Sequence, residues 1–184
     1  MPTPIGHSIA GLAVHFLARR FNPGIGWRVA LLVVVLANLP DIDFLPGYLM
    51  GDPRGYHWGP THSLFAAMMV GLAVGVMTRG NGITSRSFAL LAATAYASHL
   101  LLDLSLGPGA PSLGLQIFWP FSETRRMLPW AIFRMAPDSI ETVGPVGTLF
   151  SLEILPVVVR EIMLLAPLLG AMWIFGRRTP RSAF

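Results

Sequence analysis

The chain contains no cysteine and no lysine, and only 12% of its 184 residues are charged. Without cysteine, disulfide bonds and thiolate metal ligands are excluded, so any metal would be held by histidine, carboxylate, backbone or water oxygen. The H-E-x-x-H motif of the commonest zinc peptidases is also absent. The opening residues, MPTPIGHS, lack the basic region and small-residue cleavage site of a secretory signal peptide.

All thirteen basic side chains are arginines, scattered between apolar runs rather than gathered with aromatic residues. This distribution argues against nucleic-acid binding and favours a role in membrane orientation. The composition is 53% hydrophobic, which is outside the range of soluble domains. We therefore predict one all-α integral membrane domain, residues 1–184, with five transmembrane segments: Pro4–Leu17, Trp27–Leu39, Thr61–Met77, Ser87–Leu106 and Ile154–Phe175.

Two features modify this simple bundle. The second segment stops at Pro40, and a helix of that length spans only about 20 Å, less than a hydrocarbon core of about 30 Å. The residues after it are therefore expected near the lipid headgroups. A Gly/Pro-rich loop follows the fourth segment, and its amphipathic part, Thr124–Met135, is predicted to form an interfacial helix.

The arginines predict the orientation. With five spans, the turn Arg19–Arg28, the loop Arg79–Arg86 and the tail Arg177–Phe184 share one side, with eight arginines and no acidic residue. The positive-inside rule assigns that side, and so the C-terminus, to the cytoplasm. The segment Asn38–Leu64 then faces the periplasm or external space.

That segment is a polar island between apolar runs, and it holds three of the five aspartates and two of the five histidines. Ionisable groups beside membrane-spanning sequence are costly, so they mark a candidate functional site. Histidine and carboxylate side chains from four predicted helices meet at the same outward end: His7, Asp41, Asp43, His62, His99 and Asp103. His99 and Asp103 are four residues apart, which places both on one helical face. A site rich in imidazole suits Zn²⁺ best, with Mn²⁺ or Fe²⁺ as alternatives.

Simpler interpretations stand beside this one. A histidine–aspartate hydrogen bond without metal would explain His99 and Asp103, and a loop position would leave His57 solvated. His15 lies away from the outward end, where a packing role is the plainer explanation. Asp41 and Asp43 are two residues apart, so a regular helix cannot direct both inward; we expect one to bind metal and the other to orient a histidine.

The ordered motifs resemble the YdjM-like family of bacterial inner-membrane proteins, which are regarded as metal-dependent hydrolases. The matching pieces are Gly6-His7, Leu39–Asp43, His57–Ser63, Ser98–Asp103 and Trp119-Pro120. The family usually has arginine where this chain has Trp58. If that arginine binds an anion, Arg54, Arg125 or Arg126 would take its place here, with His57 beside the substrate or behind the metal ligands.

A more distant likeness is to the zinc-dependent phospholipase C and S1/P1-nuclease fold. It implies that His7, Asp41 or Asp43, His62, His99 and Asp103 are ligands of one or two ions. The later histidines that complete a three-zinc site are missing, because no histidine follows His99.

Together these observations predict a membrane-bound hydrolase that cleaves a phosphoester of a lipid or lipid-linked substrate with a metal-activated water. Asp41 or Asp43 is the candidate base, and the lipid substrate is inferred from the short second segment. The alternatives are a metal-handling protein that catalyses nothing, a partner-binding protein whose His and Asp groups satisfy one another, and a metal-dependent amidase or peptidase.

Overall fold

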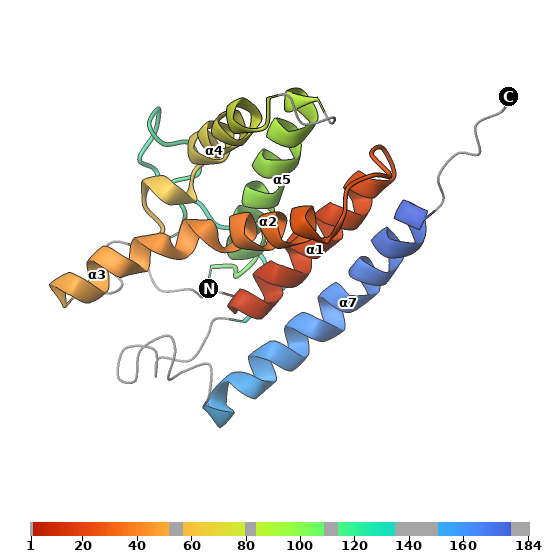
Figure 1. Ribbon diagram of the computed structural model, residues 1–184. Coiled ribbons are helices and arrows are strands. Elements are labelled where there is room, and N and C mark those ends of the chain that lie inside the picture. The colour runs from red at the N-terminus through yellow and green to blue at the C-terminus, as the bar shows by residue number, and fades with distance from the viewer. Residues whose placement is uncertain (1, 52–56, 80–83, 109–113, 135–150, 178–184) are drawn as a thin grey trace, which may run out of the picture.

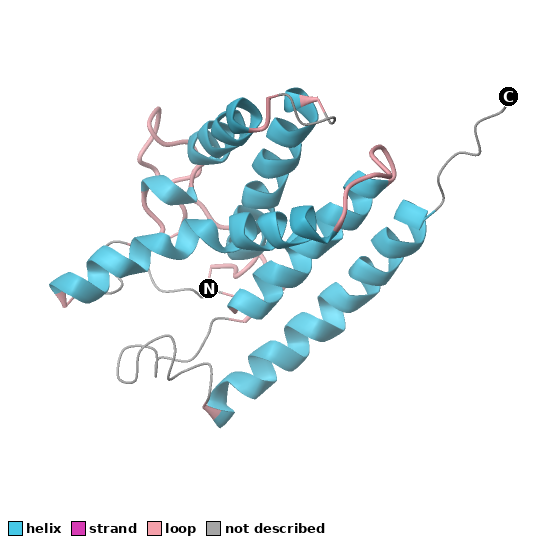
Figure 2. Ribbon diagram, in the orientation of Figure 1, coloured by secondary structure: helices cyan, strands magenta, loops and turns pink. Residues whose placement is uncertain are grey.

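The computed structural model describes residues 2–51, 57–79, 84–108, 114–134 and 151–177. Across these ranges it is helical, with no strand beyond one isolated bridge between Leu115 and Arg126 (Figure 2). The elements are α1 (Pro4–Arg19), α2 (Trp27–Asn38), η1 (Leu39–Asp43), α3 (Phe44–Met50), η2 (Pro60–His62), α4 (Leu64–Met77), α5 (Ser85–Leu104), η3 (Leu152–Ile154) and α7 (Leu155–Arg177), where η is a 3₁₀ helix.

Three helical stretches are long and apolar enough to cross a membrane: Trp27–Gly47, Ser85–Leu104 and Leu152–Arg177. The apolar helix α4 is shorter. The prediction of an all-α membrane protein is therefore confirmed.

Side-chain caps set several helix starts. Thr3 accepts a hydrogen bond from the backbone of Gly6, with Pro4 opening the first turn of α1. Ser63 and Thr84 cap α4 and α5 in the same way. These residues satisfy backbone N–H groups that have no partner within a first helical turn, which is why the apolar segments become helical where they do.

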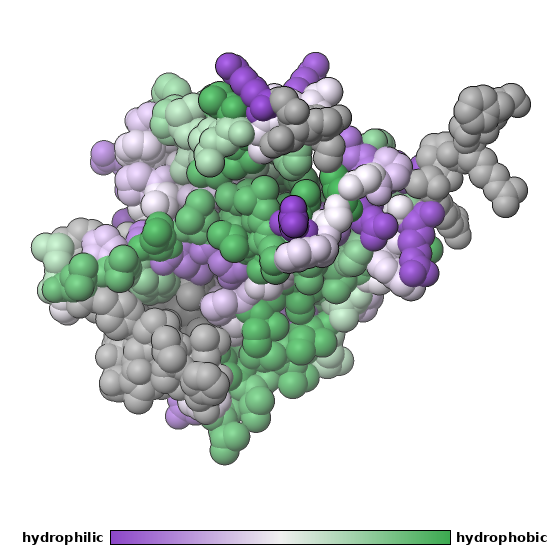
Figure 3. Space-filling view, viewed as in Figure 1, coloured by the Kyte–Doolittle hydropathy of each residue, from purple (hydrophilic) through white to green (hydrophobic). Residues whose placement is uncertain are grey.

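Helices α1 and α5 form the centre of the bundle (Figure 1). They pack against each other and against α2, while α7 covers α1 and α4 covers α5. Close approach of α4 to α5 depends on Gly71, where an added Cβ would lie 2.7 Å from the carbonyl oxygen of Ala89. The surface in Figure 3 is apolar over α1 and α7, and hydrophilic residues gather towards the end where both helices finish.

The α-helical part of the second apolar segment ends at Asn38, one residue before the predicted end, but the helical run continues past Pro40, so the prediction of a short segment was wrong. Helix α2 continues through η1 into α3, so one helical stretch of 21 residues runs from Trp27 to Gly47. Pro40 lies in the first turn of η1, where its missing N–H costs no helical hydrogen bond. The stretch is about 30 Å long, enough to cross the hydrocarbon layer. The argument for a lipid substrate from a short segment therefore fails.

The predicted interfacial helix at Thr124–Met135 was also wrong over its described part. Residues 124–134 are irregular, and Arg126 pairs with Leu115 in the isolated bridge. Further along, Leu128 donates its backbone N–H to Leu104 at the end of α5. Pro129 has no N–H to give a helix, so backbone partners elsewhere in the fold outweigh the amphipathic pattern.

Candidate metal centre

Seven polar side chains from separate elements meet at one end of the bundle. Helix α1 contributes His7, η1 contributes two aspartates, the 57–63 segment two histidines, and α5 a histidine and an aspartate: His7, Asp41, Asp43, His57, His62, His99 and Asp103. All are buried except Asp41, whose side chain is 14% exposed. All five residues predicted as metal ligands belong to this cluster.

Four ligand atoms lie at the centre: His62 Nε2, His99 Nε2, Asp41 Oδ1 and Asp103 Oδ2. The two nitrogens are 3.2 Å apart. Asp41 Oδ1 lies 3.6 Å from His62 and 3.3 Å from His99. Asp103 Oδ2 lies 3.5 Å from His62 and 3.4 Å from His99. A tetrahedral zinc site with bonds of about 2.0–2.1 Å has ligand–ligand separations of about 3.3–3.4 Å. These five separations are close to those expected between the ligands of a tetrahedral ion.

Hydrogen bonds orient both imidazoles for this role. The Nδ1–H of His99 donates to the carbonyl oxygen of Ala37 at 2.8 Å. The Nδ1–H of His62 donates to Asp43 Oδ2 at 3.0 Å. Because a neutral imidazole carries one proton, each Nε2 is left with its lone pair directed to the centre.

Asp43 lies behind the ligands. Besides His62, it accepts hydrogen bonds from His57 Nδ1 at 2.9 Å and from the Thr61 hydroxyl at 2.8 Å. Both aspartates reach the cluster because Leu39–Asp43 is a 3₁₀ helix. With three residues per turn, positions two apart project about 120° from each other, against about 160° in an α-helix. The expectation that only one could point inward assumed an α-helix.

A second group of donors surrounds His7. Its ring stacks on that of His99 with centroids 3.7 Å apart, and its Nε2 lies 3.7 Å from Asp103 Oδ1. Within the part of the chain that the structure describes, neither nitrogen of His7 has a hydrogen-bond partner. Ligand atoms of His7, Asp41 and His99 lie within 4.8 Å of one another, as do those of Asp41, His57, His62 and Asp103. Asp41 is common to both groups.

The charges of the cluster call for a cation. Three carboxylates, each with little or no exposure, share this volume, and burying them unpaired is unfavourable. Burial by itself lowers the pKa of His62, but hydrogen bonds to Asp103, Asp41 and Asp43 raise that pKa well above its usual range. The carboxylates thus attract positive charge, which a proton or a metal ion supplies.

His57 is different. Burial lowers its pKa, although the hydrogen bond to Asp43 opposes the shift. Its Nδ1 is held by Asp43, and its Nε2 is buried without a partner. Its ring stacks on Phe44 with centroids 3.9 Å apart. Among the described residues, His57 thus has a ring fixed through Nδ1 and an Nε2 that makes no hydrogen bond.

Two residues of the site were missed from the sequence. The indole N–H of Trp58 donates to Asp103 Oδ2 at 3.0 Å, and Trp58 has φ of 63°, the left-handed region that non-glycine residues rarely adopt. The sequence signal for Trp58 was its place within the His57–Ser63 motif.

Glu161, buried on α7, accepts hydrogen bonds from the backbone N–H of Thr3 at 2.6 Å and from the Thr3 hydroxyl. These bonds hold the start of α1 just before His7. A single carboxylate inside an apolar span was the signal for Glu161.

The arginines predicted to bind an anion are placed as follows. Arg54, like Asp52, lies outside the described residues. Arg125 donates from Nη1 to the carbonyl oxygen of Gly114 at 3.2 Å. The side chain of Arg126 is exposed, while its backbone pairs with Leu115.

An all-α membrane bundle with buried imidazoles and carboxylates at one end defines an integral membrane protein with a candidate metal centre. The chain matches the model of the YdjM inner membrane protein family over residues 1–179, and it belongs to that family. It is 32% identical over 145 residues to "Inner membrane protein YbcI" of Escherichia coli (strain K12), covering 76% of this chain and 80% of the relative. No solved structure matches the chain, so the likeness to zinc-dependent phospholipase C and S1/P1 nucleases has no support from known folds.

Proposed function

We propose that this chain is a membrane-bound, metal-dependent hydrolase that cleaves a phosphoester. The membrane location of the protein, and not the length of α2, is the ground for proposing a lipid or lipid-linked substrate. The carrying observation is the central group of two Nε2 atoms and two carboxylate oxygens, whose separations of 3.2 to 3.6 Å suit a tetrahedral ion. Zn²⁺ fits this donor set best, and Mn²⁺ or Fe²⁺ would also accept it.

Around one ion the central group would form a closed site with four protein ligands, so catalysis requires the donors to be divided between two ions. Structural zinc sites use four protein ligands, whereas catalytic sites keep one position for water. Two ions sharing Asp41 would use two groups of donors, one with His7 and His99 and one with His62 and Asp103, while His57 is left for proton transfer. The first group supplies three ligands and leaves a coordination position open.

When bound, a divalent cation would lower the pKa of a water molecule and polarise the phosphoryl oxygen. The protein's own groups would divide the remaining work. Asp43 holds His57 and His62 in their tautomers, since its oxygens already accept three hydrogen bonds. Asp41 keeps both oxygens without hydrogen bonds and would serve as ligand or base. His57 Nε2 would move a proton to or from the substrate. Arg54, Arg125 or Arg126 would offset the phosphate charge.

The helix directions support an outward-facing site. Helix α1 starts at the cluster and α2, with η1, ends at it, while Arg19, Arg28 and Arg86 lie at the opposite helix ends. By the positive-inside rule the cluster would face the periplasm, with the C-terminus in the cytoplasm. A cysteine introduced at Ala183 would then resist a membrane-impermeant maleimide in intact cells and react after lysis.

Elemental analysis of purified protein tests the metal centre. Wild-type protein would carry one or two equivalents of a divalent metal, and His62→Ala and Asp103→Ala would carry much less. His15→Ala is the control, because His15 is a buried histidine outside the cluster. Equal metal in all four proteins, or none in the wild type, would contradict the proposal.

A screen of metal-loaded protein against phospholipids and lipid phosphates tests the reaction. Wild-type protein would release headgroup or phosphate, and His57→Gln would keep the metal while losing most of the turnover. A wild-type protein that binds metal but hydrolyses nothing across the panel would favour the metal-handling function instead.

A further inference from the structure

The segment 114–134, here named the strap, closes the end of the bundle next to the metal centre. Gln116 donates its backbone N–H to the carbonyl oxygen of Trp58, whose indole holds Asp103. Leu64, two residues after His62, donates its N–H to the carbonyl oxygen of Ile117 at 3.0 Å. On the other side, the strap bonds to the end of α5: Leu128 to Leu104, and Ile132 and Phe133 to Ser105.

The strap is apolar on both faces. Its inner face places Leu115, Ile117 and Phe133 in the hydrophobic core. Its outer face presents large side chains with high exposed fractions: Phe118 51%, Phe121 88%, Trp130 59% and Ile132 40%. Between them the side chains of Arg125 and Arg126 are exposed. No core packing explains why three of these four outer side chains are aromatic.

The backbone geometry of the strap limits the environments in which its outer face can lie. The strap is irregular, and irregular backbone facing lipid is not tolerated in the hydrocarbon core, where unpaired N–H and C=O groups find no water. Bulk water is also a poor medium for four large exposed apolar side chains on one segment. The headgroup layer meets both requirements, because it hydrates the backbone and accepts aromatic rings and arginines.

We propose that the strap is seated in the lipid headgroup layer, with Phe118, Phe121 and Trp130 inserted and Arg126 meeting lipid phosphate. The aromatic side chains supply apolar contact, and the arginine supplies charge complementarity to an anionic lipid surface. Since the strap bonds to both sides of the metal centre, its seating holds that centre beside the headgroups. The conclusion that lipid phosphates are the nearest substrates rests on the proposed function. The position of the strap in the headgroup layer does not rest on it.

Spin labelling tests the seating, and the absence of cysteine makes single-site labelling direct. Phe121→Cys and Trp130→Cys would be labelled with a nitroxide in vesicles of phosphatidylcholine and phosphatidylglycerol. Collision with oxygen, which partitions into lipid, is compared with collision with a water-soluble nickel chelate. Three variants at exposed positions calibrate the scale: Leu72→Cys on α4 for hydrocarbon, Gly24→Cys in the α1–α2 turn for water, and Thr124→Cys for the polar part of the strap.

The expected result is a ratio of oxygen to nickel collision for Phe121→Cys and Trp130→Cys that lies between those of Leu72→Cys and Gly24→Cys and above that of Thr124→Cys. Ratios equal to that of Gly24→Cys would overturn the seating. Dipolar broadening between labels, removed by dilution with unlabelled protein, would overturn it as well, because a second copy would then cover the strap. These results do not depend on whether the protein hydrolyses anything.

Discussion

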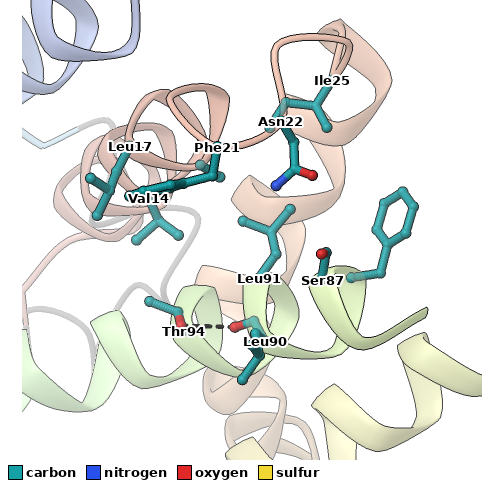
Figure 4. Close-up of a pocket in the computed structure, with 11 residues that line it drawn as sticks. Val14, Leu17, Phe21, Asn22, Ile25, Ser87, Leu90, Leu91 and Thr94 are labelled. Atoms are coloured by element: carbon teal, nitrogen blue, oxygen red, sulfur yellow. Dashed lines mark hydrogen bonds between the residues drawn. The ribbon is translucent and has the colours of Figure 1, made fainter. Parts of the chain in front are cut away.

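Helices α1 and α5 meet along their length, yet the two ends of their interface are chemically opposite. At one end they place His7, His99 and Asp103 in the metal centre. At the other they line a pocket of about 290 Å³ whose walls are apolar apart from Asn22, Ser87 and Thr94 (Figure 4). The Thr94 hydroxyl donates to the carbonyl oxygen of Leu90 in its own helix, at 2.8 Å. The comparison shows that one pair of helices can hold a polar network requiring specific partners at one end and ordinary apolar packing at the other.

The largest expected difference between the ends comes from Asp103→Ala. The substitution leaves the indole N–H of Trp58 buried without an acceptor and removes the carboxylate facing His62 and His99, so we expect a loss of about 3–5 kcal/mol in unfolding free energy. Thr94→Ala on the same helix should change it by less than about 0.5 kcal/mol. Denaturation in detergent measures both. Equal losses of unfolding free energy in the two variants would show that the polar and apolar ends of the interface contribute alike to stability.

Removing the metal should lower the unfolding temperature only when the metal centre, at the polar end of the α1–α5 interface, is intact. A ligand at 100 times its dissociation constant stabilises the folded state by about 2.7 kcal/mol. We therefore expect a chelator to lower the unfolding temperature of the wild type and to have little effect on His99→Ala. His15→Ala should respond as the wild type does. The same response from His99→Ala would place the bound metal elsewhere.

The packing of α4 against α5 gives a smaller effect on the unfolding free energy. At Gly71 an added Cβ would lie 2.7 Å from a backbone oxygen of α5, so Gly71→Ala should destabilise by about 1–3 kcal/mol. Among the described residues, no atom lies within 4 Å of a Cβ added at Gly170 on α7, and Gly170→Ala should be neutral or stabilising by up to about 1 kcal/mol. Thermal unfolding of the pair compares a contact limited by backbone with an open surface. If Gly71→Ala were as stable as Gly170→Ala, α4 would not be held as closely to α5 as described.

The smallest effect is expected in the apolar pocket. Ala18→Val adds two methyl groups beside open volume and should change stability by less than about 0.5 kcal/mol, with metal content unaltered. Ala10→Val on the same helix adds them to the packed core and should cost about 1–3 kcal/mol. A greater cost at Ala18 would mean that the pocket is filled in the folded protein.

The sequence predicted the apolar helices and the polar residues that cluster, because hydropathy and i, i+4 spacing are local properties. The geometry of Leu39–Asp43 could not be predicted in this way. Whether a proline ends a helix or begins a 3₁₀ turn depends on what receives the side chains that follow, here histidines about twenty and sixty residues further along the chain. The amphipathic pattern of 124–134 misled for the same reason, since its backbone partners lie in α5 and at Leu115.

Composition and local spacing alone determined that this is a helical membrane protein with a group of histidines and aspartates at one end of its spans, because the hydrophobic effect and helix periodicity act along the chain. Only the tertiary structure decided which nitrogen of each imidazole points to the centre, that Asp43 stands behind the ligands, and that Trp58 and Glu161 support the site. Those features arise from contacts between distant segments, where burial makes each hydrogen bond and each charge depend on a partner that no local pattern specifies.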